Sequence, residues 1–355
     1  MPRVVDMEGI GSGGGSIAWV DDYNKLHVGP QSAGADPGPV SYGKGGNLFT
    51  TTDANLATNR INPNYFCGGE IKADMNSVNK YLEVLAKNLN LSIEETSRGI
   101  IRIANNNMIN ALKLVSVNKG YDPRDFTLVA FGGGGGMHAV ALAQELGVKK
   151  VIIPAAASVF SAWGMMMSDL RRDHFVTHLV DLTEGAASDI ESVFSSVELQ
   201  AIEQFQTEGI DKKSIKFIRY GNFRYKNQEH TTEVRLSDGP ISEKQIGLIE
   251  DEFHNTYERE YTYRLDTSVE LVGIHVVATS EVGKLTMQKR PDQGIKEAEA
   301  RKGSREVDYA LEGVHKATLY NGEKLLPGME FNGPAIIEDS GATTVIHPGN
   351  RVRID

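Results

Sequence analysis

The spacing of hydrophobic residues separates the chain into segments that predict strands and segments that predict helices. Near the N-terminus, short apolar runs alternate with glycine, proline and aspartate, so Arg3–Met7, Ser16–Val20 and Leu26–Val28 are predicted to form a β-meander. Between residues 74 and 120, apolar residues recur at intervals of three and four, which predicts two helices paired as an αα-hairpin. Ser92 and Glu95 have the spacing of a capping box at the start of the second helix.

A strand, a glycine turn, a helix and a second strand are predicted next. Thr127–Phe131 is apolar, Gly132–Gly136 is an unbroken glycine run, and Met137–Leu146 has helical character. Gly147 stands where a helix end favours glycine, and Val151–Pro154 is apolar again. Strands joined by a helix in this way usually pair in parallel, which is typical of an α/β fold.

Helical and strand patterns also alternate in the second half of the chain. Residues 186–210 and 241–260 have helical periodicity, whereas residues 214–237 alternate like a β-hairpin. Val269–Ala278 predicts one strong strand, and His174–Val180 is strand-like as well.

These changes of pattern predict three domains. The first covers residues 1–165 and includes the helical hairpin at 74–120, and the second is an α+β domain over residues 166–290. Residues 283–306 are charged and poor in apolar side chains, so we expect a linker there. Short strands and turns beyond it predict a small β-rich module over residues 300–355.

Composition narrows the class of protein. The 355 residues are 40% hydrophobic and 24% charged, as in soluble globular proteins, and the net charge of −10 argues against a nucleic-acid partner. Cys67 is the single cysteine, which excludes an internal disulfide and a four-thiolate zinc site and favours the cytoplasm. The stretch most like a membrane span, Val151–Met167, is short and interrupted, so no membrane partner is expected.

Glycine-rich segments are the candidate nucleotide-binding motifs, and two of them match a known pattern imperfectly. Gly9–Gly14 fits G-x-G-x-x-G, but the following Ser16–Asp21 predicts a strand where a dinucleotide-binding fold requires a helix. Gly38–Gly45 nearly fits a P-loop, but Gly45 replaces the Ser or Thr whose hydroxyl binds magnesium. Both patterns are therefore disfavoured.

A different use of the glycines is a backbone anion site. The N–H groups of residues Gly11 to Gly15 can form a concave nest for an anion. In the run from Gly132 to Gly136, a glycine turn before a helix lets a purine nucleoside lie against backbone, and the helix N-terminus favours negative charge. The alternative is that both segments are only tight turns.

Single side chains give weaker signals. Asp36 and Asp53 are loop carboxylates that suit Mg²⁺ bound together with phosphate oxygens, although each alternatively caps its own backbone. The nine histidines are scattered, so no metal site built from protein ligands alone is predicted. No G-x-S-x-G motif is present, and no catalytic residue is identified.

Several stretches together resemble the hydantoinase A/5-oxoprolinase family, in that family's order and over nearly the whole chain. They are Asp6–Ala18, Val28–Pro39, Thr52–Asn55, Ala130–Gly135, Tyr257–Tyr263, Gly333–Glu338 and Thr343–Val345. The family resembles the actin-like ATPases, in which ATP lies between two ribonuclease-H-like lobes. The resemblance implies an α/β fold, namely the second actin-like lobe with a helical insertion, followed by an α+β segment and the β-rich module.

The resemblance also assigns binding residues. It makes Asp6–Ala18 the second phosphate hairpin, whose contacts come from Asp6, Gly11, Ser12, Gly13, Gly14 and Gly15. It makes Phe131–Gly136 the adenosine motif, whose contacts come from Gly132, Gly133, Gly134, Gly135 and Gly136. Asp36 and Asp53 become Mg²⁺-linked carboxylates of the same cleft, so ATP and Mg²⁺ are the implied cofactors.

The sequence also departs from the family pattern. Family chains are about twice as long and carry an Asp-x-Gly-Gly-Thr phosphate hairpin in their first half, which these residues lack, and Glu8 stands where many relatives have His or Arg. We therefore expect a C-terminal-half subunit, a cleaved product or a partial chain that is inactive alone. Its expected partners are the chain with the first phosphate hairpin and a hydantoinase B-type subunit.

The implied chemistry is activation of an oxygen atom by phosphoryl transfer from ATP. The leading hypothesis is a subunit of an ATP-dependent cyclic-amide hydrolase of the hydantoinase or oxoprolinase type. The alternatives are a subunit of an acetone- or acetophenone-type ketone carboxylase and a non-catalytic structural half of such a complex. The small-molecule substrate stays open, because Tyr225–His230, the best polar cluster of the second half, also fits a hairpin turn.

Overall fold

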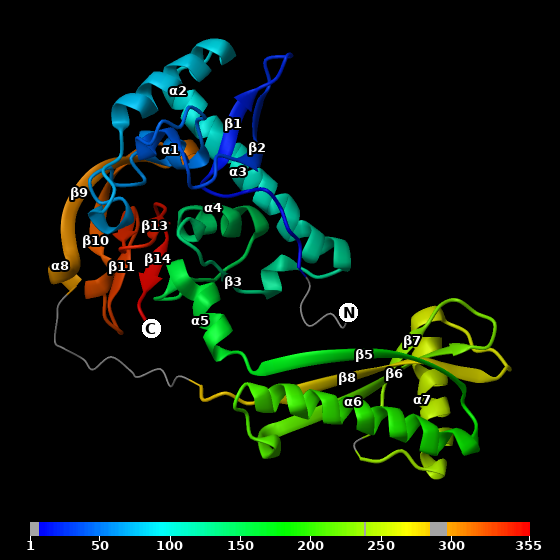
Figure 1. Cartoon of the computed structure of the whole chain (residues 1–355). Coiled ribbons are helices and arrows are strands. Elements are labelled where there is room, and N and C mark those ends of the chain that lie inside the picture. Colours follow the sequence, from blue (N-terminus) through cyan, green and yellow to red (C-terminus); the bar gives the residue numbers. More distant parts are fainter. Residues whose placement is uncertain (1–6, 238, 285–296) are drawn as a thin grey trace. The chain divides into compact units, whose positions relative to one another are not determined.

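The computed structural model describes residues 7–237, 239–284 and 297–355, which form two compact units (Figure 1). The first unit comprises the described residues up to 163 and those from 297 onward, and the second comprises the described residues between them. Asp6 and all but the last residue of the predicted strand Arg3–Met7 lie outside the described residues.

The first unit opens with an antiparallel hairpin of β1 (Ser16–Val20) and β2 (Leu26–Ser32), which confirms these two predicted strands. Asp21 shapes the turn between them, because its Oδ1 accepts hydrogen bonds from the backbone N–H groups of Tyr23 and Lys25, both at 2.9 Å. Helix α1 (Thr51–Ala57) follows the hairpin in the chain, and Thr51 and Thr52 at its start are buried.

The predicted helical hairpin is confirmed as α2 (Met75–Leu89) and α3 (Ile93–Val115). Asn90 ends α2 in the left-handed conformation with φ 55°. The Ser92–Glu95 capping box starts α3: the Ser92 N–H donates to Glu95 Oε2 at 2.9 Å, and the Glu95 N–H donates to Ser92 Oγ at 3.1 Å.

The predicted parallel unit is also present, with very short strands. β3 (Leu128–Val129) and β4 (Val151–Ile152) pair in parallel around α4 (Gly135–Leu146), whose C-cap is the left-handed Gly147. The apolar segment beyond β4 continues into α5 (Phe160–Met167). Among the described residues, every helix is too short or too polar to cross a membrane.

A terminal sheet completes the first unit, with strand order β13-β12-β10-β9. Its strands are β9 (Arg301–Asp308), β10 (Val314–Asn321), β12 (Ala335–Glu338) and β13 (Thr343–Ile346). The short helix α8 (Glu297–Ala300) precedes the sheet, and β11 (Glu330–Asn332) pairs beside it with β14 (Arg351–Arg353).

The linker predicted over residues 283–306 is wrong for its C-terminal part, where α8 and β9 lie, and residues 285–296 fall outside the described residues. β9 is an edge strand that pairs along its length with β10 and leaves most of its charged side chains exposed. β9 therefore forms strand-to-strand hydrogen bonds on one side only, and its sequence lacks the alternation of apolar and polar residues that predicts a strand.

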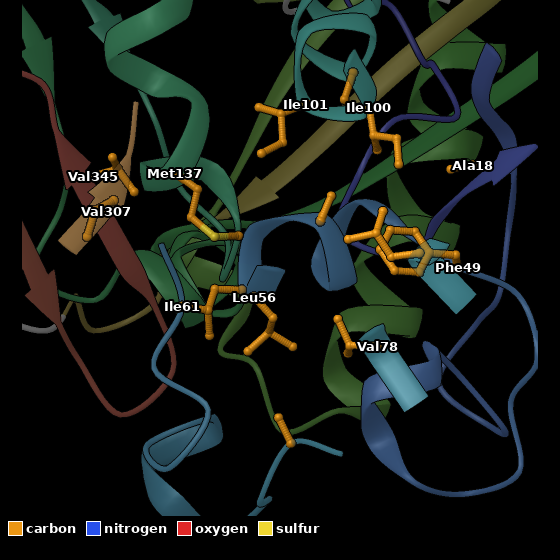
Figure 2. Packing of buried hydrophobic residues seen from close by; sticks show 14 of the residues in the cluster. Ala18, Phe49, Leu56, Ile61, Val78, Ile100, Ile101, Met137, Val307 and Val345 are labelled. Carbon is orange, nitrogen blue, oxygen red and sulfur yellow. The ribbon is translucent and has the colours of Figure 1, made fainter. Parts of the chain in front are cut away.

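The terminal sheet packs within the first unit and does not form a third compact unit. Figure 2 shows Met137 of α4 beside Val307 of β9 and Val345 of β13, in a cluster that also includes Leu56 and Val78. Hydrogen bonds add to this packing, since the Asp308 N–H donates to Thr58 O at 3.0 Å. Arg60 Nε, in turn, donates to Asp308 O at 2.9 Å.

The second unit is an antiparallel sheet of strand order β5-β8-β6-β7 with two helices. Its elements are β5 (Leu170–Asp181), α6 (Ala187–Thr207), β6 (Ile215–Tyr225), β7 (Thr232–Arg235), α7 (Glu243–Tyr261) and β8 (Val269–Ser280). All follow the predicted pattern. The polar segment after Tyr225 is the β6–β7 turn, and Tyr225 itself is buried in the core between sheet and helices.

Glu338 of β12 is a buried carboxylate that forms ion pairs with Lys302 and Arg305 of β9 in the terminal sheet. Burial alone would raise the pKa of Glu338, but hydrogen bonds from Lys302 and Arg305, both 2.6 Å long, outweigh burial and lower it. The contribution of the carboxylate to stability is therefore present above pH 4.5, its ordinary pKa, and is lost as the pH falls through the lowered value.

Replacing Glu338 with Gln should lower the free energy of unfolding by about 2 kcal/mol at pH 7, because charge-assisted hydrogen bonds are lost. Urea unfolding of the variant and the parent at neutral and acidic pH measures this difference. The control is Glu330→Gln, which removes an exposed pair with Arg351 and should cost less than about 1 kcal/mol. Equal losses in the two variants, or a Glu338→Gln loss that persists below the lowered pKa, would contradict the assignment.

Candidate functional site

The first glycine segment, Gly9–Gly15, leads straight into β1, and the helix that a dinucleotide-binding motif requires is not there. The segment ends in a turn in which the Ser16 N–H donates to Gly13 O at 3.1 Å. The Gly13 N–H donates in return to Ser16 Oγ at 2.9 Å. This N–H is therefore already engaged, so the predicted nest of five N–H groups is incomplete.

Close packing explains most glycines of this segment. A Cβ on Gly11 would lie 2.4 Å from Pro30 O, one on Gly14 would lie 2.6 Å from Thr52 Oγ1, and one on Gly15 would lie 2.7 Å from Ser32 Oγ. Gly13 differs, because a Cβ there would meet no atom of the described structure within 4 Å. Gly9 shares this property, so Gly9 and Gly13 are the two glycines of the segment at which a side chain is sterically free.

A pocket of about 470 Å³ lies beside the first glycine segment. Its walls come from residues 10–12, from β2 and from α3, and they include the polar side chains of Ser12, His27, Asn107 and Asn110. Ser12 Oγ is buried and meets no hydrogen-bond partner among residues 7–237, 239–284 and 297–355. The histidine count alone gave no reason to select His27, which becomes prominent only through this placement.

His27 is held on two sides. Its Nε2 lies 2.8 Å from Asp21 Oδ2, and its ring stacks on Trp19 with centroids 4.4 Å apart. The hydrogen bond from His27 is the main cause that lowers the pKa of Asp21, so this carboxyl group is ionised at neutral pH. An ionised carboxylate only accepts, so Nε2 carries the proton of this hydrogen bond.

The second glycine segment, Gly132–Gly136, forms the turn into α4, as predicted. Gly132 has φ 86°, which favours glycine, and its N–H donates to Ala157 O at 2.6 Å. The N–H groups of Gly135 and Met137 bond within the turn. Those of Gly133 and Gly134 meet no acceptor in the described part of the chain, and Gly133 is exposed. These two N–H groups stand at the positive end of the helix dipole, where an anion is favoured.

The strand β13 and the loop before it press against this second segment. A Cβ on Gly136 would lie 2.6 Å from Thr344 Oγ1 and 2.9 Å from Thr343 O, and one on Gly133 would lie 3.1 Å from Gly341 O. Gly134 is more open, because the nearest atom is the flexible end of Met137 at 3.4 Å. The two glycine segments therefore rest on different neighbours, the first on β2 and α1 and the second on β13.

The two candidate carboxylates have different surroundings. Asp53 is fully buried, and its oxygens accept from the N–H groups of Ser41 at 3.0 Å and Thr50 at 2.8 Å and from the Thr50 hydroxyl at 2.8 Å. Burial raises its pKa, which the hydrogen bonds from Ser41 and Thr50 partly offset. Asp53 thus caps α1, which is the alternative role that its sequence context left open. The Thr52 N–H of the same helix donates to Gly14 O at 2.8 Å. The Mg²⁺ link of Asp53 stays a prediction. Asp36 lies exposed in a turn.

The predicted absence of a protein-only metal site and the P-loop-like segment can be compared with the described residues. The described residues include no group of three or more His, Cys, Asp or Glu side chains arranged to hold a metal ion. The P-loop-like segment Gly38–Gly45 contains a single 3-10 turn, Val40–Tyr42, and no α-helix follows it directly.

A buried polar cluster behind α4 was not predicted from the sequence. His138 of α4 is buried, and its Nδ1 lies 2.6 Å from Asn105 Oδ1 on α3. Burial, aided by the charge of Arg60, lowers the pKa of His138 to about 4. His138 is therefore neutral at pH 7 and acts as a hydrogen-bonded link between the two helices.

The fold and these segments define a member of a known family. The model of the hydantoinase/oxoprolinase family matches residues 2–174, and that of the hydantoinase/oxoprolinase C-terminal domain matches residues 180–355. The chain belongs to the hydantoinase/oxoprolinase family, which confirms the resemblance found in the motifs.

Particular relatives include enzymes of two kinds. A protein of Methanocaldococcus jannaschii, itself uncharacterized, is 37% identical over 352 residues, which are 99% of this chain and 50% of that protein. Caprolactamase subunit alpha of Pseudomonas jessenii is 32% identical over 99% of this chain and 51% of its own length. The crystal structure of ATP-dependent caprolactamase from that organism matches 97% of this chain and 50% of its own, with a TM-score of 0.73.

The second kind of enzyme is a carboxylase. A nucleotide-free structure of acetone carboxylase, described as performing ATP-dependent acetone carboxylation, has a TM-score of 0.86 and 25% identity over 97% of this chain and 50% of that one. These likenesses establish a mixed α/β fold shared with both enzymes. The chain spans about half the length of the relatives it matches.

Gly136 allows a direct test of the packing at the second glycine segment. Gly136→Ala should lower the free energy of unfolding by about 1–3 kcal/mol, because the new Cβ collides with β13 backbone and Thr344. Gly13→Ala is the matched control and should leave stability nearly unchanged, since its Cβ enters open space. Thermal unfolding of both variants measures the contrast, and similar midpoints for the two would refute the close approach of β13.

Proposed function

We propose that the first unit is a nucleotide-binding lobe of an ATP-dependent enzyme, related to the second lobe of actin-like ATPases. The observation that supports this most is the glycine turn at the start of α4, where Gly133 and Gly134 carry N–H groups without an acceptor in the described structure. A side chain at these positions would stand between such donors and a bound nucleotide, so glycine lets the ligand approach the backbone.

The first glycine segment is the proposed second contact. Gly13 has open space where a Cβ would be, so a ligand can approach the loop there. The Ser12 hydroxyl lacks a partner among the described residues, but its oxygen is buried and is not offered to a ligand in this structure. Gly11, Gly14 and Gly15 support the loop from behind by packing against β2 and α1. Asp6, the remaining candidate contact, lies outside the described residues.

The proposed reaction is ATP-dependent activation of a cyclic amide. Caprolactam, the substrate that gives the relative caprolactamase its name, is a cyclic amide, and that relative is the more similar of the two named enzymes by sequence identity. Catalysis of phosphoryl transfer rests mainly on positioning and charge stabilisation, which backbone-rich glycine turns can provide. Asp36 is exposed and remains the proposed carboxylate near Mg²⁺, which would neutralise phosphate charge when bound.

A carboxylase is the second candidate, because the fold matches acetone carboxylase with the higher TM-score. In either case we propose that this chain acts together with the part of its relatives that it does not match, which would supply the first phosphate hairpin, and with a B-type subunit. Subunit names among the relatives, such as caprolactamase subunit alpha, support an assembly of several chains.

Nucleotide binding provides the first test. Gly134→Val and Gly13→Val should each weaken ATP binding at least about tenfold while the protein stays folded, because a larger side chain displaces the ligand without meeting backbone. Titration calorimetry with ATP measures affinity, and thermal unfolding checks the fold. The control is Gly247→Val on α7 of the second unit, where the backbone is helical and a Cβ meets no atom within 4 Å. Unchanged affinity in both site variants would refute the site, and an absence of ATP binding by the parent would favour a structural role.

Turnover distinguishes the two reactions. In the assembled enzyme, ATP hydrolysis should rise on addition of a cyclic amide and should be indifferent to bicarbonate. A rise that requires both a ketone and bicarbonate would contradict the hydrolase and favour the carboxylase. Measurement of ADP release with each substrate, with and without bicarbonate, decides between them.

A further inference from the structure

His275 of β8 is a buried histidine on the face of the second unit's sheet that lies away from α6 and α7. Its chain neighbours Ile274 and Val276 pack in the core between sheet and helices, and successive side chains of a strand point to opposite faces. The side chain is nevertheless fully buried. Phe175 of β5 stacks on the imidazole with centroids 4.1 Å apart, and Tyr220 of β6 with centroids 5.2 Å apart. Both are register partners of His275, so the pairing of the strands aligns the three rings.

Both ring nitrogens of His275 face a carboxylate. Nε2 lies 2.8 Å from Asp173 Oδ1, and Nδ1 lies 2.9 Å from Glu233 Oε2. Asp173 belongs to β5 and Glu233 to β7, which are the two edge strands of this sheet. The ring therefore connects the edges of the sheet across the two strands between them.

Arg171 makes the two carboxylates unequal. It binds Asp173 with two hydrogen bonds, from Nε at 2.9 Å and from Nη2 at 2.8 Å. These bonds are the main cause that lowers the pKa of Asp173 to about 2, so this carboxyl group is ionised at neutral pH. In the part of the chain that the structure describes, Glu233 has no ion-pair partner besides His275. The position of Glu233 thus depends on the imidazole, whereas Asp173 has a second partner.

The two contacts of the ring require an additional proton. An ionised carboxylate only accepts, and a neutral imidazole has a single N–H, so one nitrogen would meet a carboxylate with its lone pair. Both contacts are hydrogen bonds only when a second proton lies between Nδ1 and Glu233. On the ring, this proton balances the charges of Arg171, Asp173 and Glu233. Two further groups that can carry a charge lie nearby, namely Tyr220 against the ring and Arg235 opposite Tyr220 on β7.

We propose that His275 is a proton-dependent lock on the edge strand β7. With the second proton in place, the ring donates to Asp173 and Glu233 together and holds both edge strands. When the pH rises and that proton leaves, the Nδ1 lone pair faces the Glu233 carboxylate and the contact is lost. Asp173 keeps the remaining N–H of the ring and its two bonds from Arg171, so β7 is released and β5 is not.

β7 is sensitive to this contact because its pairing is short. It pairs with β6 over four residues, whereas β5 pairs with β8 from Leu170 to Asp181. The pairing of β7 continues by one further bond, from the Leu236 N–H to Arg219 O at 2.9 Å. Loss of the Glu233 contact therefore loosens β7 and the β6–β7 turn before it affects the rest of the sheet.

The test follows the ring and the strand in one titration from slightly acidic to alkaline pH. NMR of the chain with ¹⁵N-labelled histidine reports how many protons the His275 ring carries, and the variant His275→Phe identifies its signal. Hydrogen exchange at the Leu236 N–H reports the pairing of β7, as a protection factor that removes the intrinsic effect of pH. We expect protection of Leu236 to fall about tenfold as the ring loses its second proton. Protection of the Leu182 N–H, which donates to Val269 O at 2.9 Å, should stay constant.

The variant Glu233→Gln separates the lock from ordinary packing. A glutamine side chain can donate to Nδ1 as well as accept from it, so it keeps the contact when the proton leaves. The fall in Leu236 protection should therefore disappear. The matched control is Asp189→Asn, which makes the same change from carboxylate to amide at His178, where Nε2 lies 2.8 Å from Asp189 in the second unit. This control should leave the fall intact.

Several results would overturn the proposal. They are a His275 ring that keeps the same number of protons throughout the titration, and a constant Leu236 protection while the ring loses a proton. A fall that persists in Glu233→Gln, or one that disappears in Asp189→Asn, would also contradict it. The lock and its reporters lie in the second unit, so none of these results depends on nucleotide binding.

Discussion

The first unit depends on one junction, where the end of α1 meets the edge strand β9 more than 240 residues later in the chain. Arg60 is buried with 1% of its surface exposed and donates from Nε to Asp308 O at 2.9 Å. Arg305 donates to Asn59 O at 2.7 Å and to Arg60 O at 2.9 Å, and a third bond of 2.6 Å reaches Glu338 of β12. Burial lowers the pKa of Arg60 to about 10, partly opposed by Asp308 and other neighbours, so its guanidinium remains charged at neutral pH. The Arg60 side chain thus bonds the backbone of β9, and Arg305 of β9 bonds the backbone at Asn59 and Arg60 in return, so side chain–backbone hydrogen bonds fix the terminal sheet on this segment.

The candidate site follows from this junction in a few steps. In the terminal sheet β9 is paired with β10, β10 with β12, and β12 with β13, so fixing β9 also fixes β13. β13 lies so close to α4 that Gly136 has no room for a side chain. The start of α4, with the free N–H groups of Gly133 and Gly134, is thereby held from one side. From the other side, Asn105 of α3 holds His138, which the nearby Arg60 charge helps to keep neutral. A rigid helix N-terminus aimed at a ligand is what an anion site requires, because it loses no energy to reorganisation.

Sequence reasoning succeeded where a local rule determines structure and failed where distant contacts do. The Ser92–Glu95 box and the glycine at the end of α4 are local, and they predicted the start of α3 and the end of α4 correctly. β9 was mistaken for a linker because an exposed edge strand needs only a partner and no apolar pattern. Asp53 has the composition of a metal ligand, yet its neighbours in space, Ser41 and Thr50, use its oxygens. His27 was overlooked because its importance comes from Asp21, Trp19 and a pocket that α3 completes.

Hydrogen exchange is the most direct test of the central claim that the α4 glycine turn is a nucleotide site. Mass spectrometry should follow the peptide that spans Gly132–Met137, with and without a non-hydrolysable ATP analogue. The account predicts slower exchange at Gly133 and Gly134, since their N–H groups gain an acceptor on the ligand, with little change in the turn at Gly120. Unchanged exchange at Gly133 and Gly134 under saturating nucleotide would contradict it.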